Sequence, residues 1–317
     1  METFKWAYLG AGHIAETTAK ELRTGGTNEI VAVWNRTFAK AEAFVREYGG
    51  TAYETPEAAI NAPGVEGVYI AVNADRHADL MKLCIELGKP VLCEKPFTVN
   101  AAQAEEVFRL AKEKGVYVSE AMWTWHNAPA LKVKEWVDSG RLGKIREVKA
   151  SFVRPLIHYA KMPRLTTNEM IGGALMDTGV YAVAYAYRLF GMPEKIECDG
   201  HIEGGVDLGE HIRMIYPGFI VDVDVAMDRE GGEYFNITGT DCSIRVPRFH
   251  DTDSAECGSE VFTHKANRYD VQFSNVAREI RDGLTEGAMV PSKSTIEVMK
   301  LLDECRRQMG VTYPGER

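Results

Sequence analysis

The sequence predicts an α/β protein in which an N-terminal parallel sheet is followed by an α+β domain built on a largely antiparallel, open sheet. Three observations lead to this fold class. About the first 120 residues alternate short apolar runs with helical segments, which is the pattern of a parallel sheet. Beyond them the apolar period changes to two, as in antiparallel strands. The 317 residues also suffice for two cores, so we expect domains at 1–121 and 122–317.

Five apolar runs mark the strands of the first domain. They are KWAYLG, EIVAVWN, GVYIAV, PVLC and GVYVSE, which begin at Lys5, Glu29, Gly67, Pro90 and Gly115. Helices fill the gaps between them. Apolar residues recur at helical spacing in the segment 38–48, and Thr55-Pro56 is typical of an N-cap followed by proline at the first helical position.

The second domain combines helices with long strands. We expect helices at 129–139, 172–190 and 294–309. In the segment GFIVDVDVAMD (218–228), apolar residues alternate with aspartates, which indicates a strand with one packed face. The polar outer face of this sheet is either solvated or covered by a second copy of the chain, and we expect a homodimer formed through the C-terminal sheet.

Composition and charge exclude several classes of protein. The net charge is −9 at pH 7, whereas a nucleic-acid site usually needs a basic face. No apolar run approaches the roughly 20 residues of a membrane span, and the first residues lack a signal-peptide pattern. The six cysteines are scattered, so we expect neither a disulfide framework nor a metal site. These features favour a cytoplasmic protein that acts on a small molecule.

A glycine-rich turn follows the first strand. In YLGAGHIA, Gly10, Gly12 and Ala15 stand at the junction of strand and helix, as in the Rossmann dinucleotide-binding fingerprint. Gly10 permits the tight turn, Gly12 lets the backbone approach a pyrophosphate, and Ala15 lets the helix pack on the strand. The helix N-terminus, with His13 and Ile14, favours the anion. We therefore predict a dinucleotide site rather than an ordinary turn.

The end of the second strand selects the cofactor. NAD enzymes usually place a carboxylate there for the ribose hydroxyl, but this chain has Asn35, Arg36 and Thr37. Arg36 can pair with the 2′-phosphate of NADP, aided by its polar neighbours and by Lys40. The alternative is that Arg36 is a surface arginine of an enzyme that uses NAD(H). We expect NADP(H) as the cofactor.

A charged turn follows the strand PVLC. The strand runs into Glu94, Lys95 and Pro96, although Lys and Glu are among the residues least often buried. Taken alone, this stretch is typical of a solvated loop. However, open α/β folds bind their ligands at the carboxyl edge of the parallel sheet, and Lys95 stands at that edge.

Together these motifs resemble a known family. The glycine turn, VLCEKP and GGALMDTGVY (172–181) are similar to motifs of the Gfo/Idh/MocA oxidoreductases, and the resemblance covers essentially the whole chain. Within this family, SEAMWTWHNAP, SGRLGKIREVKASF and MGVTYP most resemble the dihydrodiol dehydrogenases and NADP-dependent D-xylose dehydrogenases. The resemblance implies an NAD(P)-dependent dehydrogenase or reductase. It would move a hydride between nicotinamide and a carbonyl or secondary alcohol of a sugar, polyol or cyclic diol.

The resemblance also implies a catalytic site. In such enzymes the lysine of E-K-P stands beside the nicotinamide and the substrate oxygen, so Lys95 would polarise a carbonyl or stabilise an alkoxide. Many members carry histidine near the place of Tyr181, and we predict that Tyr181 moves the proton. A free phenol titrates near ~10, and the Lys95 ammonium would lower that pKa. Asp177, on the same helix face, would orient Lys95 or bind a substrate hydroxyl. The alternative for Tyr181 is a buried phenol bonded to backbone.

Other positions are assigned in the same way. Val72, Asn73 and His77 lie where relatives have a T-P-x-x-x-H pattern beside the cofactor, although His77 equally suits packing. Glu94 and Trp123 complete the expected cofactor contacts. The expected walls of the substrate pocket are Trp123, Trp125, Phe152 and His158. Paired aromatic residues equally suit an interdomain core.

Two other functions fit the same architecture. A sensor or regulator would bind NAD(P) without turnover, but it could lose the lysine or the proton donor, and this chain has both. An NAD-assisted glycoside hydrolase would retain its cofactor and show no net reduction. Because a fold does not determine a function, the prediction of an oxidoreductase depends on Lys95 and Tyr181.

Overall fold

The computed structural model describes residues 3–159, 163–265, 268–314 and 316. The chain forms two compact units by its internal contacts. Unit 1 comprises residues 1–98, 102–126 and 267–295, and unit 2 comprises residues 99–101, 127–266 and 296–317. A linear division at residue 121 differs from this arrangement, because the segment 267–295 packs with the N-terminal unit. That segment contains a helix, α9 (Arg268–Arg281), which the sequence analysis left unassigned.

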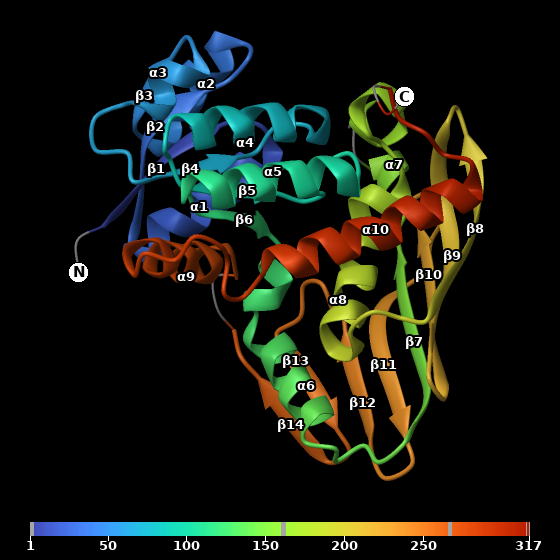
Figure 1. Ribbon diagram of the computed structural model, residues 1–317. Helices are drawn as coiled ribbons and strands as arrows, with labels where there is room; N and C mark the ends of the chain where they lie inside the picture. Colours follow the sequence, from blue (N-terminus) through green and yellow to red (C-terminus); the bar gives the residue numbers. More distant parts are fainter. Residues whose placement is uncertain (1–2, 160–162, 266–267, 315, 317) are drawn as a thin grey trace. The chain divides into compact units, whose positions relative to one another are not determined.

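A six-stranded parallel sheet forms the centre of unit 1 (Figure 1). Its strand order is β3-β2-β1-β4-β5-β6, which is the order of a Rossmann fold and places a ligand crevice at the switch between β1 and β4. The predicted parallel sheet is confirmed. Its strands are β1 (Phe4–Leu9), β2 (Asn28–Trp34), β3 (Thr51–Tyr53), β4 (Gly67–Ile70), β5 (Val91–Glu94) and β6 (Val118–Ala121).

Helices cover both faces of this sheet (Figure 1). The core on one face joins Trp6, Tyr8 and Tyr69 of the sheet to Phe273 of α9, and the rings of Trp6 and Phe273 lie 5.1 Å apart. The helices on this face are α1 (His13–Gly25), α2 (Phe38–Tyr48) and α9. The helices on the other face are α4 (His77–Glu86) and α5 (Ala101–Lys114).

The short helix α3 (Pro56–Ile60) begins as the sequence predicts. The hydroxyl of Thr55 accepts a hydrogen bond from the amide of Ala58 at 3.2 Å, and Pro56 occupies the first turn. This N-cap satisfies one of the amides that a helix N-terminus leaves unpaired. The predicted cap is confirmed.

An eight-stranded sheet forms one layer of unit 2 (Figure 1). Its order is β14-β13-β12-β11-β7-β10-β9-β8, and β7 and β10 are its parallel pair. In β10 the valines at alternate positions are buried and the aspartates between them are half-exposed, so the predicted alternation is confirmed. The strands are β7 (Ile145–Val153), β8 (Lys195–Glu203), β9 (Val206–Tyr216), β10 (Phe219–Ala226), β11 (Glu233–Gly239), β12 (Ser243–Pro247), β13 (Ser254–Cys257) and β14 (Glu260–Thr263).

Three long helices lie over one face of this sheet (Figure 1). They are α6 (Ala128–Asp138), α8 (Val180–Phe190) and α10 (Ser292–Met309), the last of which starts in unit 1. A π-helical turn, Leu175–Gly179, leads directly into α8. A four-residue helix, α7 (Leu156–Tyr159), follows β7.

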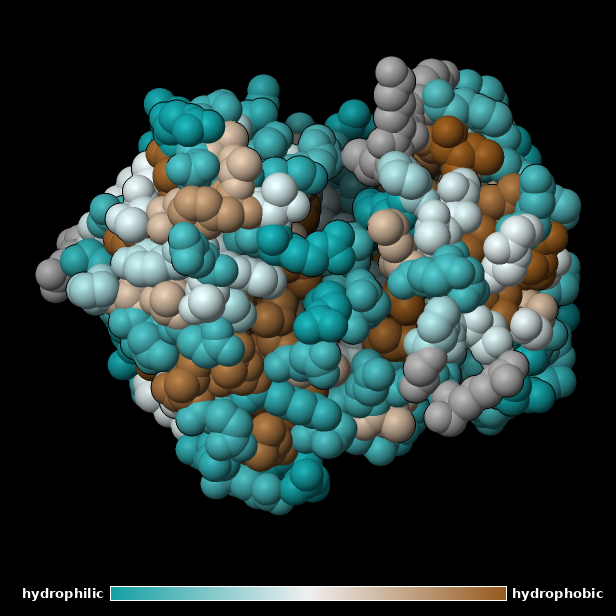
Figure 2. Space-filling model, turned by 90° about the horizontal axis from the view of Figure 1, so that it is seen from above, coloured by the Kyte–Doolittle hydropathy of each residue, from teal (hydrophilic) through white to brown (hydrophobic). Residues whose placement is uncertain are grey.

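The surface visible from above is mostly hydrophilic, with apolar side chains in scattered patches (Figure 2). Across the described residues, no helix combines the length and the apolar character that crossing a bilayer would require.

Candidate functional site

The turn after β1 has the geometry of a phosphate-binding loop. Gly10 has φ +120°, and a Cβ atom there would meet the carbonyl oxygen of Ala71 at 2.2 Å, so only glycine fits. Beside Gly12, a Cβ atom would meet no described atom within 4 Å. Helix α1 begins at this point without a side-chain cap. Uncapped amides next to open space suit an anionic group such as a pyrophosphate.

The residue that follows β2 is hydrogen-bonded to this turn. The side-chain oxygen of Asn35 accepts from the amide of Ala11 at 3.3 Å, and its nitrogen donates to the carbonyl of Thr37 at 3.0 Å. Arg36 and Thr37 are exposed. Burial raises the pKa of Asp75, which follows β4, and the guanidinium groups of Arg76 and Arg36 oppose that rise. No pattern in the sequence indicated Asp75, a carboxylate whose pKa the charge of Arg36 lowers.

His77 holds two sheet-edge segments together. Its ring is 1% exposed, with Nδ1 3.0 Å from the carbonyl oxygen of Pro96 and Nε2 3.1 Å from that of Val72. Burial lowers the pKa of His77, so the neutral ring donates through one nitrogen at a time. The structure therefore gives His77 a packing role between the ends of β4 and β5. The predicted cofactor contacts of Val72, Asn73 and His77 stay predictions.

In the charged turn after β5, Glu94 is buried and Lys95 is half-exposed. Glu94 accepts a hydrogen bond of 2.5 Å from the hydroxyl of Tyr69. Burial and the charge of Glu94 raise the pKa of Tyr69 well above its usual value, so this hydroxyl remains a donor. Lys95 is half-exposed at the carboxyl end of β5, and the Lys95-Pro96 peptide bond is cis. Glu94 thus anchors the turn, whereas its predicted cofactor contact stays a prediction.

Glu120, on the neighbouring strand β6, makes the stability of unit 1 depend on pH. Burial raises its pKa to about 7, against the hydrogen bond from Thr295 and together with the charge of Glu94. The folded state therefore binds a proton more tightly than the unfolded state does. Proton binding by Glu120 therefore contributes to the stability of the folded state. This contribution is fully present below pH ~4.5 and is lost as the pH rises through about 7.

We expect Glu120→Gln to remove this dependence, because the amide keeps an acceptor for the Thr295 hydroxyl at 2.9 Å and cannot ionise. The difference in free energy of unfolding between the variant and the wild type should increase by about 2–3 kcal/mol from pH 5 to pH 8, in favour of the variant. Urea unfolding at the two pH values measures it. Glu113→Gln, on the exposed face of α5, is the matched control, and an equal change in both variants would contradict the assignment.

In unit 2, the glycines of GGALMDTGVY sit where side chains would collide. A Cβ atom at Gly173 would lie 2.2 Å from a carboxylate oxygen of Asp207, and one at Gly179 would lie 2.8 Å from Glu210. The backbone therefore approaches both acids closely at these glycines. Asp207 and Glu210 are buried acids that the sequence analysis missed, and burial raises the pKa of both. Asp207 accepts from the amide of Leu175 at 2.6 Å and so supports the π-helical turn.

Asp177 lies in this turn and pairs with an arginine. Arg164 donates to its carboxylate at 2.8 Å, and the Asp177 side chain is 15% exposed. No pattern in the sequence indicates this pair, because thirteen positions separate its members. Arg164 thus holds Asp177 in place at the surface. The catalytic role of Asp177 stays a prediction.

Tyr181 packs among aromatic rings of unit 2, and we call Phe152, Tyr181 and His250 the ring wall. It is 7% exposed, and its ring centroid lies 6.3 Å from that of Phe152 and 5.1 Å from that of His250. The Nδ1 of His250 lies 2.8 Å from the buried carboxylate of Glu233, which also pairs with Arg154. Unit 2 therefore brings Phe152 to Tyr181, and the role of Phe152 as a pocket wall stays a prediction. It adds three residues that the sequence analysis missed.

The other expected pocket residues belong to other segments of the chain. His158 is exposed, with Nε2 3.2 Å from the carbonyl oxygen of Asp228. Trp123 and Trp125 belong to unit 1 and are buried, and the Trp123 ring lies 5.1 Å from that of Tyr269. The substrate contacts of these residues stay predictions. The structure also describes no group of three His, Cys, Asp or Glu residues arranged to hold a metal ion.

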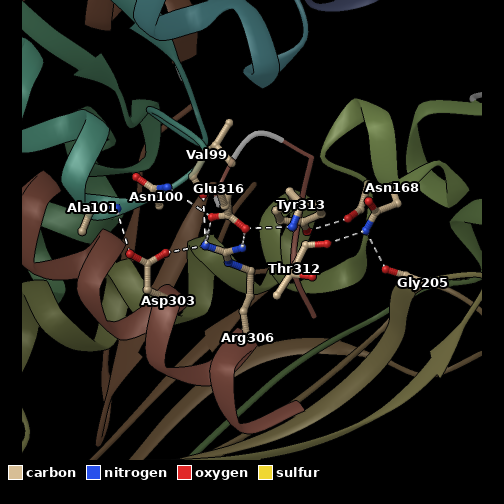
Figure 3. Close-up of polar contacts among 11 residues, drawn as sticks. Val99, Asn100, Ala101, Asn168, Gly205, Asp303, Arg306, Thr312, Tyr313 and Glu316 are labelled. Carbon is tan, nitrogen blue, oxygen red and sulfur yellow. Dashed lines mark hydrogen bonds and ion pairs between the residues drawn. The ribbon is translucent and has the colours of Figure 1, made fainter. Parts of the chain in front are cut away.

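Arg306 of α10 centres a buried polar cluster in unit 2 (Figure 3). Its two terminal nitrogens bind the two carboxylate oxygens of Glu316 at 2.7 Å each. One of them also donates to Asp303 at 2.6 Å and to the carbonyl of Val99 at 3.2 Å. The guanidinium lies over the ring of Tyr313. A bidentate pair with this much burial holds the C-terminal segment firmly.

The cluster reaches the flanks of both motifs. Asp303 accepts from the amide of Ala101 at 2.8 Å (Figure 3), and Ala101 follows the E-K-P turn by five residues. The hydroxyl of Tyr313 donates to the carbonyl of Gly172 at 2.7 Å, at the start of GGALMDTGVY. Within unit 2, the C-terminal segment thus holds the backbone at Ala101 and at Gly172, the first residue of GGALMDTGVY.

We expect Arg306→Met to lower the free energy of unfolding by about 3 kcal/mol, because it leaves buried carboxylates without their cation. Arg307→Met is the matched control. Arg307 is its exposed neighbour and pairs only with Glu304 among the described residues, so its loss should cost about 0.5 kcal/mol or less. Chemical denaturation of both variants measures the difference. Equal losses would show that the cluster adds nothing beyond a surface ion pair.

Unit 1 has a Rossmann sheet with an uncapped glycine turn and a lysine at its carboxyl edge. Unit 2 carries an aspartate and a tyrosine in one motif. This combination defines the class of dinucleotide-dependent oxidoreductases. Residues 4–122 match the model described as "Oxidoreductase family, NAD-binding Rossmann fold". Residues 130–245 match the "GFO/IDH/MocA C-terminal domain". The chain belongs to the GFO/IDH/MocA family of oxidoreductases.

Relatives and solved structures agree with this family. A trans-1,2-dihydrobenzene-1,2-diol dehydrogenase from Mus musculus is 30% identical over 99% of each chain. A D-xylose 1-dehydrogenase (NADP(+)) from Hypocrea jecorina is 27% identical over 98% of this chain and 93% of its own length. A 3-ketoreductase from Actinomadura kijaniata, solved with NADP and TDP-benzene, has a TM-score of 0.87 at 22% identity, covering 97% of this chain and 98% of its own. The last comparison shows the shared fold.

Proposed function

We propose that the protein is an NADP(H)-dependent dehydrogenase or reductase that moves a hydride between nicotinamide and a carbonyl or secondary alcohol. Its substrate would be a sugar, a polyol or a cyclic diol. The observation that carries this proposal is the half-exposed Lys95 at the carboxyl end of β5, on the same sheet edge as the glycine turn. The named activities of the dihydrodiol and D-xylose dehydrogenases support the substrate class.

Each candidate residue has a defined task in this proposal. Hydride transfer is the chemistry that a bound nicotinamide supplies. The amides of the glycine turn and of α1 bind the pyrophosphate, and Arg36 binds the 2′-phosphate. The Lys95 ammonium stabilises the negative charge that grows on the substrate oxygen. The Tyr181 hydroxyl gives that oxygen a proton in reduction and takes it in oxidation. Asp177, held by Arg164, positions a substrate hydroxyl.

A spectrophotometric screen tests the proposal. Purified protein is mixed with NADPH or NADP and with aldoses, inositols, dihydrodiols or dicarbonyls, and the nicotinamide absorbance is followed. We expect turnover with at least one of these classes. Tight NADP binding without turnover would instead support a sensor. A retained cofactor with glycoside cleavage and no net reduction would support the hydrolase.

Arg36→Ala tests the choice of cofactor. A hydrogen bond to a charged group contributes about 1.5–3 kcal/mol. The ratio of kcat/KM for NADP to that for NAD should therefore fall about 10–100-fold, because only NADP carries the 2′-phosphate. Initial rates with both cofactors measure this ratio. Arg46→Ala, an exposed arginine of α2, is the control. An unchanged ratio in Arg36→Ala would assign the preference to other residues.

We also propose that the protein is a homodimer of the cytoplasm. The eight-stranded sheet has a hollow of about 490 Å³, whose lining includes Arg146, Lys149, Ile215, Ile220 and Asp222. Ile215 and Ile220 are half-exposed and pair across adjacent strands, and an apolar pair within a charged rim suits an interface. All six cysteines are free thiols, as in a reducing compartment. Sedimentation equilibrium tests the dimer, and a monomer at micromolar concentration would reject it.

A further inference from the structure

Cys242 and Cys257 form a close pair of thiols in unit 2. Their sulfur atoms lie 3.2 Å apart, although the residues are 15 positions apart in the chain. Cys242 directly precedes β12, and Cys257 ends the antiparallel neighbour β13, opposite Ile244. A disulfide has an S–S distance of about 2.05 Å. The two sulfurs therefore need to approach by only about 1 Å to bond.

The backbone around the pair favours this approach. The amide of Gly258 donates to the carbonyl of Ser243 at 3.1 Å, so the residues next to both cysteines are joined. Gly258 has φ +61°, and a Cβ atom there would lie 3.1 Å from the sulfur of Cys242. The glycine thus leaves the space in which the Cys242 sulfur lies against Cys257.

The two thiols differ in access and in chemistry. Cys242 is half-buried, whereas Cys257 is only 2% exposed. Burial and the contact with Cys242 raise the pKa of Cys257 to about 11, and the guanidinium of Arg141 opposes this rise. Arg141 is held nearby by Glu260 at 2.6 Å. Cys242 is therefore the sulfur that an oxidant reaches first, and Cys257 lies behind it.

We propose that Cys242 and Cys257 are a redox-active dithiol that a small disulfide such as oxidised glutathione converts to an intramolecular disulfide. The Cys242 thiolate attacks the glutathione disulfide, forms a mixed disulfide and releases one glutathione thiolate. The Cys257 thiolate then attacks the Cys242 sulfur and releases the second glutathione. The protein loses two electrons and two protons, and one oxidised glutathione becomes two reduced molecules.

The bond would close a loop that reaches the ring wall of unit 2. Residues 243–256 include His250, whose ring lies 5.1 Å from that of Tyr181, and Phe249, whose ring lies 5.4 Å from that of Tyr185. Closing this loop restricts the unfolded chain, so oxidation should raise the melting temperature. The proposal does not depend on the proposed oxidoreductase activity.

Peptide mapping of the full-length protein tests it. The reduced protein is incubated with oxidised glutathione, its remaining thiols are alkylated in denaturant, and the product is digested with trypsin without reduction. Cleavage after Arg229, Arg245, Arg248 and Lys265 places the two cysteines in separate peptides, 230–245 and 249–265. We expect these peptides to be joined and two of six thiols to escape alkylation.

Single variants separate the two steps. Cys257→Ser should trap a glutathione adduct on Cys242, and Cys242→Ser should leave Cys257 unmodified. Cys198→Ser, which removes a buried cysteine elsewhere in unit 2, should oxidise like the wild type. Six alkylated thiols in the treated wild type, a link between other cysteines, or a link between two chains would each overturn the proposal.

Discussion

Replacing Lys95 with methionine is expected to lower kcat by about 10²–10³-fold, which is the usual effect of removing one donor to a developing oxyanion. Methionine keeps the length of the side chain and removes its charge. Glu94 would still anchor the turn through Tyr69, so the backbone at the end of β5 should not move. The change therefore isolates the contribution of the amine, and steady-state rates with the substrate found by screening measure it.

Two further measurements make this result specific. NADPH affinity, followed by fluorescence titration, should change far less than kcat, since the glycine turn and Arg36 hold the rest of the dinucleotide. Lys112→Met removes an exposed lysine of α5 and should leave kcat unchanged. If Lys95→Met retains normal turnover, the lysine is not the group that stabilises the reacting oxygen.

Tyr181→Phe is expected to lower kcat by about 10²–10⁴-fold, the range for losing a positioned proton donor. Phenylalanine keeps the ring that packs on Phe152 and His250, so the wall of unit 2 should persist. The variant should bind NADPH nearly as well as the wild type. Its pH–rate profile should also lose the limb that reports the phenol, whereas a purely structural role would lower the rate equally at every pH.

Tyr185→Phe is the matched control, because it makes the same change one turn further along α8. The Tyr185 ring packs on Phe235 and Phe249, and its hydroxyl has no hydrogen-bond partner among the described residues. Removing an unpaired buried hydroxyl should leave kcat unchanged and stabilise the fold slightly. Near-normal turnover in Tyr181→Phe would disprove the assignment of the proton donor.

Local pattern was enough to predict five of the six strands of the N-terminal sheet, and it missed the short edge strand β3. The strands of unit 1 are short apolar runs between helices, and the glycine turn places the first crossover. Helix α9 shows where this approach ends. Phe273, Val276, Ala277 and Ile280 have the spacing of one helix face, so the helix itself could have been found. Its packing against Trp6 could not, since the two residues are 267 positions apart (273 − 6).

The same distinction holds for the candidate site. Residue types and motif resemblance were sufficient to select Lys95, Asp177 and Tyr181. Residue types and motif resemblance did not indicate Arg164 beside Asp177, nor the Glu233–His250 pair beside Tyr181. A charged residue looks alike in sequence whether it is solvated or buried with a partner, because its energy depends on neighbours that the fold supplies.

The amino-acid sequence by itself determined the alternation of strands and helices in the first domain and the dinucleotide-binding turn, because these depend on short-range spacing. With the family resemblance, it also selected the candidate catalytic groups. Only the tertiary structure decided what surrounds those groups. It turned Glu94 inward, fixed the C-terminal segment through Arg306, and paired Cys242 with Cys257. Each of these contacts joins separate segments of the chain. Their proximity arises from strand pairing or from docking of the C-terminal segment, which no local pattern encodes.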